Sequence, residues 1–290
     1  RDLMKGSLDA VLIEFDPNGS LATTHDGQGS DMGLFGGLLG WDAADERLVS
    51  SGKAIKEAGI SVEIAIRDIQ ASHPNTYKLT LSNASEQHVL TANSTGGGMV
   101  ELTSVDGIAY KSYGDYYETL IQTSSDPAPI LNALGVDWDG VTVHGDKTRL
   151  IQVRGQRFVE ASVLDDLDIE NVFRLRPVLP VLSRKNMTVP FLRCDEMLSH
   201  PETASRSLAE LAIDYESERG GLKRDAVLKK MIDIVKLLQR SVMEGVTGTQ
   251  FEDRILHFQC GKFKDEMDAG RLLDAGMLNR MVLYVTALME

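Results

Sequence analysis

Alternation of apolar and polar positions predicts strands through the first two thirds of the chain. Residues 61–67 and 76–82 alternate with a period of two, and residues 88–93 return after an S-N-A-S turn. This pattern is typical of a strand followed by a β-hairpin. Shorter apolar runs predict further strands at 10–15, 99–102, 107–111, 116–123, 141–143 and 149–153.

Helical spacing dominates the last third. Residues 207–215 open with the capping box S-L-A-E, and residues 222–246 predict a long amphipathic helix. We expect further helices at 42–59, 126–134, 264–269 and 272–289. The change of pattern falls near residues 183–190. The chain is therefore expected to be α+β, with an N-terminal mixed α/β-sheet domain over 1–186 and an all-helical segment over 187–290.

The stretch from Gly19 to Trp41 is the least generic part of the chain. Its first half is polar and rich in glycine, and its second half is a run of small and apolar residues. Glycine at this density indicates backbone with positive φ or a close approach of another element. The spacing matches neither the dinucleotide-binding fingerprint nor a Walker A loop. Composition leaves two interpretations open, a packing hub or a pocket.

Three polar loops are candidate binding loops. The first, T-T-H-D-G-Q-G-S-D at 23–31, holds two aspartates that are either helix caps or ligand contacts. The second, H-P-N-T at 73–76, presents a turn histidine or a polar group beside a pocket. The third, G-G-G at 96–98, forms a sharp turn or a cradle of backbone N–H groups for an anion. The candidate site residues are His25, Asp26, Gly27, Gly29, Ser30, Asp31, His73, Asn75, Thr76, Gly96, Gly97 and Gly98.

Composition narrows the classes of function. The 290 residues are 42% apolar, which supports one large or two ordinary globular domains with a real core. The net charge of −13 argues against a general nucleic-acid binder, because phosphate binding needs a basic face. No apolar run reaches the length that spans a membrane. Neither nucleic acid nor a membrane is an expected partner.

Cysteine usage and the two ends of the chain add two expectations. Cys194 and Cys260 are far apart, and a metal or iron–sulfur site takes about three or four ligands, so we expect none on this chain. Two isolated cysteines also indicate a reducing cytoplasm. Residues 1–6 look like the last turn of a helix, and residues 278–290 stop inside an apolar helical pattern. We therefore expect the chain to be a fragment.

The motifs resemble the iron–sulfur-dependent L-serine dehydratases (L-serine ammonia-lyases). Those of the β domain occur in order: G-S-L-A-T-T-H-D-G-Q-G-S-D from residue 19, H-P-N-T from 73 and G-G-G from 96. Three later segments are similar to the opening helices of the family's α domain: I-D-Y-E-S-E-R-G-G-L from 213, G-T-Q-F-E-D-R-I-L from 248 and L-L-D-A-G-M-L-N-R-M from 272.

The resemblance implies a fold and a reaction. The β domain is similar to the substrate-binding regulatory domain of some phosphoglycerate dehydrogenases. The reaction is β-elimination of water from L-serine to give pyruvate and ammonia. In the family a [4Fe–4S] cluster with an open iron binds the substrate hydroxyl as a Lewis acid, while a base removes the α-proton. The cluster ligands would lie outside this chain, and the loops at 27–31, 73–76 and 96–98 would hold the carboxylate or line a domain interface.

The resemblance also implies partners and a setting. L-Serine or a similar small amino acid is the expected ligand, a homodimer the expected assembly, and amino-acid metabolism including gluconeogenesis the expected context. This chain alone is expected to be inactive. A second hypothesis is a non-catalytic module that senses an amino acid or assembles with a separate catalytic chain. A third is a relative that acts on another hydroxy- or thiol-bearing amino acid.

Overall fold

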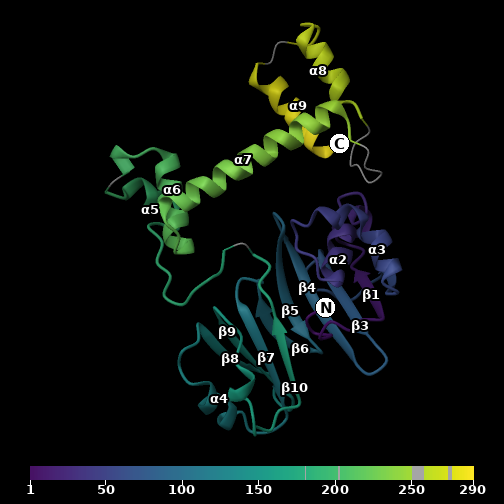
Figure 1. The fold of residues 1–290 in the computed structure, drawn as a ribbon, viewed down its shortest axis with the longest axis vertical. Coiled ribbons are helices and arrows are strands. Elements are labelled where there is room, and N and C mark those ends of the chain that lie inside the picture. The colour runs from purple at the N-terminus through teal and green to yellow at the C-terminus, as the bar shows by residue number, and fades with distance from the viewer. Residues whose placement is uncertain (180, 202, 250–257, 274–275) are drawn as a thin grey trace. The chain divides into compact units, whose positions relative to one another are not determined.

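The computed structural model describes residues 1–290 except 180, 202, 250–257 and 274–275, and it is α+β as expected (Figure 1). The chain forms two compact units. The first comprises Arg1–Asp26 and Ser30–Met187, and the second comprises Gly27–Gly29 and Thr188–Glu290. Both β-sheets belong to the first unit.

A six-stranded sheet, called sheet A, forms the larger part of the first unit. Its strands lie in the order β2-β1-β3-β4-β5-β6. β1 pairs in parallel with β2 and antiparallel with β3, and the remaining pairs are antiparallel. The strands are β1 (Ala10–Phe15), β2 (Ser61–Ile66), β3 (Thr76–Ser82), β4 (Gln87–Gly96), β5 (Met99–Val105) and β6 (Ile108–Ser112). The expected strand and hairpin are thus confirmed.

Short helices connect β1 to β2. They are α1 (Leu21–Thr24), α2 (Ser30–Leu39), the 3-10 helix η1 (Glu46–Ser50) and α3 (Ser51–Glu57). The expectation of one helix over 42–59 is wrong. The Asp45 carboxylate accepts a hydrogen bond from the Arg47 backbone N–H at 2.9 Å and starts η1 as a separate tight turn.

A four-stranded antiparallel sheet, called sheet B, follows in the order β10-β7-β9-β8. Its elements are β7 (Tyr117–Thr123), α4 (Ala128–Leu134), β8 (Gly140–His144), β9 (Arg149–Gly155), the 3-10 helix η2 (Ala161–Val163) and β10 (Asn171–Leu175). Pro127 stands directly before α4, where its fixed φ suits a helix start. β10 forms one edge of this sheet.

Successive side chains of a strand point to opposite faces, so sheet B has two different surfaces. Leu120 and Phe173 join Ile13 of sheet A in one hydrophobic core. Ile121, the neighbour of Leu120, packs instead with Ile130 of α4. Sheet B therefore lies between sheet A and α4.

The second unit is helical. It contains α5 (Cys194–Ser199), the 3-10 helix η3 (Thr203–Ser205), α6 (Leu208–Gly220), α7 (Arg224–Thr247), α8 (Cys260–Asp268) and α9 (Met277–Met289). The expected capping box is confirmed, because Ser207 and Glu210 bond each other's backbone N–H groups. The last helix begins at Met277, later than the expected 272. Residues 250–256 of the motif from 248 lie outside the described residues.

Candidate functional site

The first two candidate loops meet at one edge of sheet A. Because β1 and β3 are antiparallel, Phe15 at the end of β1 lies opposite Tyr77 at the start of β3. The chain that leaves β1 therefore runs beside the chain that enters β3. The Asn75 side-chain oxygen accepts hydrogen bonds from the backbone N–H and the hydroxyl of Ser20, at 2.9 and 3.1 Å. This contact joins two loops that are 55 residues apart.

Gly19 allows this close approach. A Cβ at Gly19 would lie 2.0 Å from the carbonyl oxygen of Pro74, which is far inside van der Waals contact. Only glycine fits between the loops without moving backbone. For this glycine, the packing interpretation of the Gly19–Trp41 stretch holds.

His25 and Asp31 form a side-chain pair at the same edge. The His25 Nδ1 lies 2.8 Å from both carboxylate oxygens of Asp31, and the ring stacks on Phe15 with centroids 5.0 Å apart. When Nδ1 carries the proton and donates it to Asp31, the neutral ring keeps Nε2 as an acceptor. Asp31, in the first turn of α2, thus orients the His25 ring.

The second loop is held mostly by its own bonds. His73 Nδ1 accepts a hydrogen bond from the Asn75 backbone N–H at 3.1 Å, which is the geometry of a turn histidine. The Thr76 hydroxyl lies 2.6 Å from the His73 carbonyl oxygen and 2.8 Å from the side-chain oxygen of Asn93 in β4. These contacts fix the entry to β3 and bring Asn93 into the site.

Tyr77 connects the two loops to the start of the glycine hairpin. Burial raises the pKa of its hydroxyl, and hydrogen bonds with Ser94 and Ser30 act in the opposite direction. The Ser94 backbone N–H also donates to the Asn75 carbonyl oxygen at 2.8 Å. The Tyr77 hydroxyl therefore connects Ser30, one of the candidate residues, to Ser94 at the base of the β4–β5 hairpin.

The three glycines themselves form the tip of that hairpin. Gly96 pairs with Met99, which leaves Gly97 and Gly98 as a two-residue turn. Their φ angles are 61° and 78°, the positive values that such turns require. Turn geometry accounts for G-G-G, and the two central glycines are exposed.

The other candidate residues of the first loop lie between α1 and α2. Asp26, Gly27 and Gly29 occupy this turn, where Gly29 adopts a φ of 78°. The structure thus brings together His25, Ser30, Asp31, His73, Asn75 and Thr76. It adds Ser20, Tyr77 and Asn93, which the sequence reasoning did not select. The strand register could have indicated Asn93, because it lies opposite Thr76.

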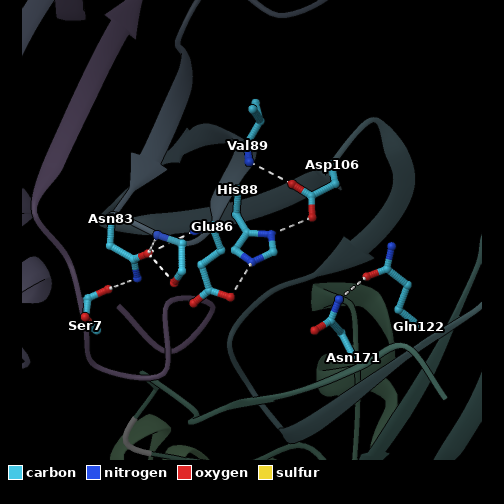
Figure 2. Close-up of polar contacts among 9 residues, drawn as sticks. Ser7, Asn83, Glu86, His88, Val89, Asp106, Gln122 and Asn171 are labelled. Carbon is cyan, nitrogen blue, oxygen red and sulfur yellow. Dashed lines mark hydrogen bonds and ion pairs between the residues drawn. The ribbon is translucent and has the colours of Figure 1, made fainter.

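Figure 2 shows a second polar cluster at the opposite end of β4, around His88. His88 is 6% exposed and was not selected from the sequence. Its Nδ1 lies 2.8 Å from Asp106, and its Nε2 lies 3.7 Å from Glu86 without a hydrogen bond. Its ring meets Phe173 of sheet B edge-on at 5.0 Å. Through His88, the cluster connects β4 to Asp106 in the turn after β5 and connects sheet A to sheet B.

The two cysteines are too few to hold an iron–sulfur cluster. Such clusters are held by Cys thiolates in sets of about four, whereas this chain has two cysteines. Cys194 is exposed on α5, and Cys260 is buried on α8, where burial and then the Glu290 charge raise the pKa of its thiol. The residues present do not fit the cluster. Among the described residues, no group of three or more His, Cys, Asp or Glu side chains could hold a metal ion.

Within the residues that the structure describes, no helix has both the length and the apolar character needed to cross a bilayer.

The first unit is thus an α+β domain whose paired sheets present polar loops at one edge. Two curated relatives share part of the sequence of this chain. The chain is 33% identical over 121 residues to the probable L-serine dehydratase beta chain of Bacillus subtilis (strain 168), covering 42% of this chain and 54% of that relative. It is 34% identical over 113 residues to the L-serine dehydratase beta chain of Peptoniphilus asaccharolyticus, covering 38% and 50%.

The alignments confirm the similarity to L-serine dehydratase beta chains that the motifs predict. The chain spans about half the length of the curated relatives it matches. No family model matches the chain.

Proposed function

We propose that this chain is part of an enzyme that eliminates water from L-serine to give pyruvate and ammonia. The observation that carries the proposal is the 33–34% identity to two proteins named as L-serine dehydratase beta chains. The convergence of the first two motif loops at one sheet edge supports it. A small polar substrate suits an edge built from imidazole, amide and hydroxyl groups.

The first unit would bind the amino acid through this edge. An ammonium group needs acceptors, and Asn75 Oδ1 and the Asp31 carboxylate are acceptors on adjoining loops. A carboxylate needs donors, and the Tyr77 hydroxyl would supply one. The alternative is that these loops line a domain interface. In that case, other groups would bind the amino acid.

The cofactor and the remaining machinery would lie elsewhere. We include in the proposal a [4Fe–4S] cluster whose ligands are outside this chain, because the two cysteines here do not fit one. The cluster would supply a Lewis acid for the departing hydroxyl. This chain alone would then be inactive, and the complete enzyme would be a cytoplasmic homodimer.

Substitution of Asn75 tests the substrate-binding role. In the complete enzyme that contains this chain, Asn75→Ala removes the acceptor that joins the two loops. We expect the KM for L-serine to rise about tenfold, which corresponds to one lost hydrogen bond. The measurement is the rate of pyruvate formation against L-serine concentration.

Asn83→Ala is the matched control. Asn83 also holds a turn next to β3 through its side-chain oxygen, but at the other end of the strand. Its KM should stay at the wild-type value. Equal KM values for Asn75→Ala, His73→Ala, Asp31→Ala and wild type would refute the binding role.

A second candidate is a non-catalytic module that senses an amino acid or assembles with a separate catalytic chain. It is favoured by the names of both relatives, which describe a beta chain. Calorimetric binding of L-serine by this chain, together with a KM for pyruvate formation that Asn75→Ala leaves unchanged, would select this candidate.

A further inference from the structure

A carboxyl group is buried between the two sheets of the first unit. Glu118 of β7 lies on the same face as Leu120, which belongs to the core that both sheets share. Glu118 is 1% exposed. Its Oε1 accepts a hydrogen bond from Gln152 at 3.2 Å, and its Oε2 is buried without a hydrogen-bond partner.

Gln152 of β9 connects this carboxyl group to both sheets. Its side-chain N–H group donates to the Lys111 carbonyl oxygen of β6 at 2.9 Å, as well as to Glu118. Its side-chain oxygen lies 3.1 Å from Nε2 of His144 in β8. The hydroxyl of Tyr110, also on β6, is buried and has no hydrogen-bond partner. A charge on Glu118 would therefore sit among incompletely satisfied polar groups.

The charges around Glu118 do not neutralise it. The titratable groups that face it are Tyr110 from β6, Asp115 from the turn before β7, His144 from β8 and Arg154 from β9. Burial is the largest influence and raises the pKa of the Glu118 carboxyl from 4.5 to about 7. The polar side chains of Ser112 and Gln152 and the Arg154 charge act in the opposite direction, with less effect.

We propose that Glu118 is a proton-operated switch, which packs sheet B on sheet A as a neutral acid and loosens that packing when it releases its proton to solvent. The geometry carries the proposal. A neutral acid satisfies Oε1 through Gln152 and leaves no charge in the core. An ionised carboxylate leaves an uncompensated buried charge, which opening of the sheets would hydrate.

The direction of the pH effect follows from the two states of the chain. The folded pKa is raised above the unfolded value, so the folded state holds the proton more tightly. The stabilisation is fully present below pH about 4.5 and is lost as the pH rises through about 7. A shift of this size changes the unfolding equilibrium by roughly 300-fold in total, from a pH well below the lower value to a pH well above the higher one.

Glu118→Gln tests the switch, because glutamine keeps the shape and cannot ionise. Trp41 and Trp138, the two tryptophans of the chain, both lie in the first unit, so tryptophan fluorescence reports its unfolding by urea. Between about pH 5 and about pH 8, we expect the wild-type unfolding constant to rise by roughly 70-fold relative to the variant. Parallel behaviour of the two proteins would overturn the proposal.

Two further measurements keep the test decisive. Glu63→Gln changes an exposed glutamate of β2 and should keep the wild-type pH dependence. If Glu118→Gln does not fold, infrared spectroscopy of the wild type replaces it. At about pH 6 ordinary carboxyl groups are ionised, so a carbonyl band of a protonated acid that vanishes toward pH 8 supports the switch. Its absence at pH 6 would exclude the switch.

Discussion

The two units treat their apolar surface in opposite ways. In the first unit, strands from both sheets bury their apolar side chains in a shared core, and Leu120 is 0% exposed. In the second, α7 is 24 residues long and fully described, yet Gly245 is its single buried residue. Leu228, Met231, Val235 and Leu238 of α7 are each about half exposed. The pattern of apolar positions therefore predicts strands in the first unit and a helix in the second, but it predicts burial only in the first.

Truncation of one leucine in each unit would break this comparison most strongly. Leu120→Ala leaves a cavity between the sheets and should destabilise the first unit by about 3 kcal/mol. Leu238→Ala removes a half-exposed side chain and should change the stability of the second unit by about 0.5 kcal/mol or less. Tryptophan fluorescence during urea unfolding measures the effect of Leu120→Ala, and hydrogen exchange of α7 measures the effect of Leu238→Ala. Equal losses would show that α7 buries its apolar face.

Substitution of the glycine at the loop contact should give the next largest loss of stability. Gly19→Ala forces a Cβ against the Pro74 carbonyl oxygen and should cost about 2 kcal/mol in the first unit. Gly33→Ala is the matched control within α2, where a Cβ meets nothing within 4 Å. Alanine favours a helix over glycine, so this variant should gain up to about 1 kcal/mol. Urea unfolding followed by tryptophan fluorescence measures both, and a neutral Gly19→Ala would contradict the close approach.

A local cap in the second unit gives the smallest effect. Ser207→Ala removes the acceptor for the Glu210 backbone N–H and should destabilise α6 by about 1 kcal/mol. Ser241→Ala, inside α7, exchanges a serine for a better helix former and should be neutral or stabilising. Hydrogen exchange of the two helices separates the variants. No change in α6 would mean that packing, and not capping, holds this helix.

Local rules account for what the sequence could predict. The hairpin of β3 and β4 follows from alternation, and α6 follows from Ser207 and Glu210, because both signals lie within a few residues. The helix expected over 42–59 divides at Asp45, whose side chain competes for the backbone. Membership of a candidate loop was likewise visible for His25 and Asn75, since each stands in a polar motif.

Long-range placement could not be predicted in the same way. Glu118 stands in Y-E-T-L-I-Q-T, where alternation shows a strand without showing which face another sheet covers. The contact between Asn75 and Ser20 depends on how β1 and β3 pair across the sheet. A one-residue slip of the register would move every side chain of a strand to the other face of the sheet. A single sequence does not specify which residues of two distant strands pair.

The position of β1 between β2 and β3 has a consequence for the order in which the chain can assemble. Ser82 meets Gln87 across the short hairpin turn, but it also meets Ala10, 72 residues away. Loop-closure entropy grows with the logarithm of the separation, so the long closure costs about 2 kcal/mol more than the short one. The hairpin of β3 and β4 is thus a template that can exist before β1 reaches it. The edge that joins Ser20 to Asn75 is completed only when the most distant strand pairing has formed.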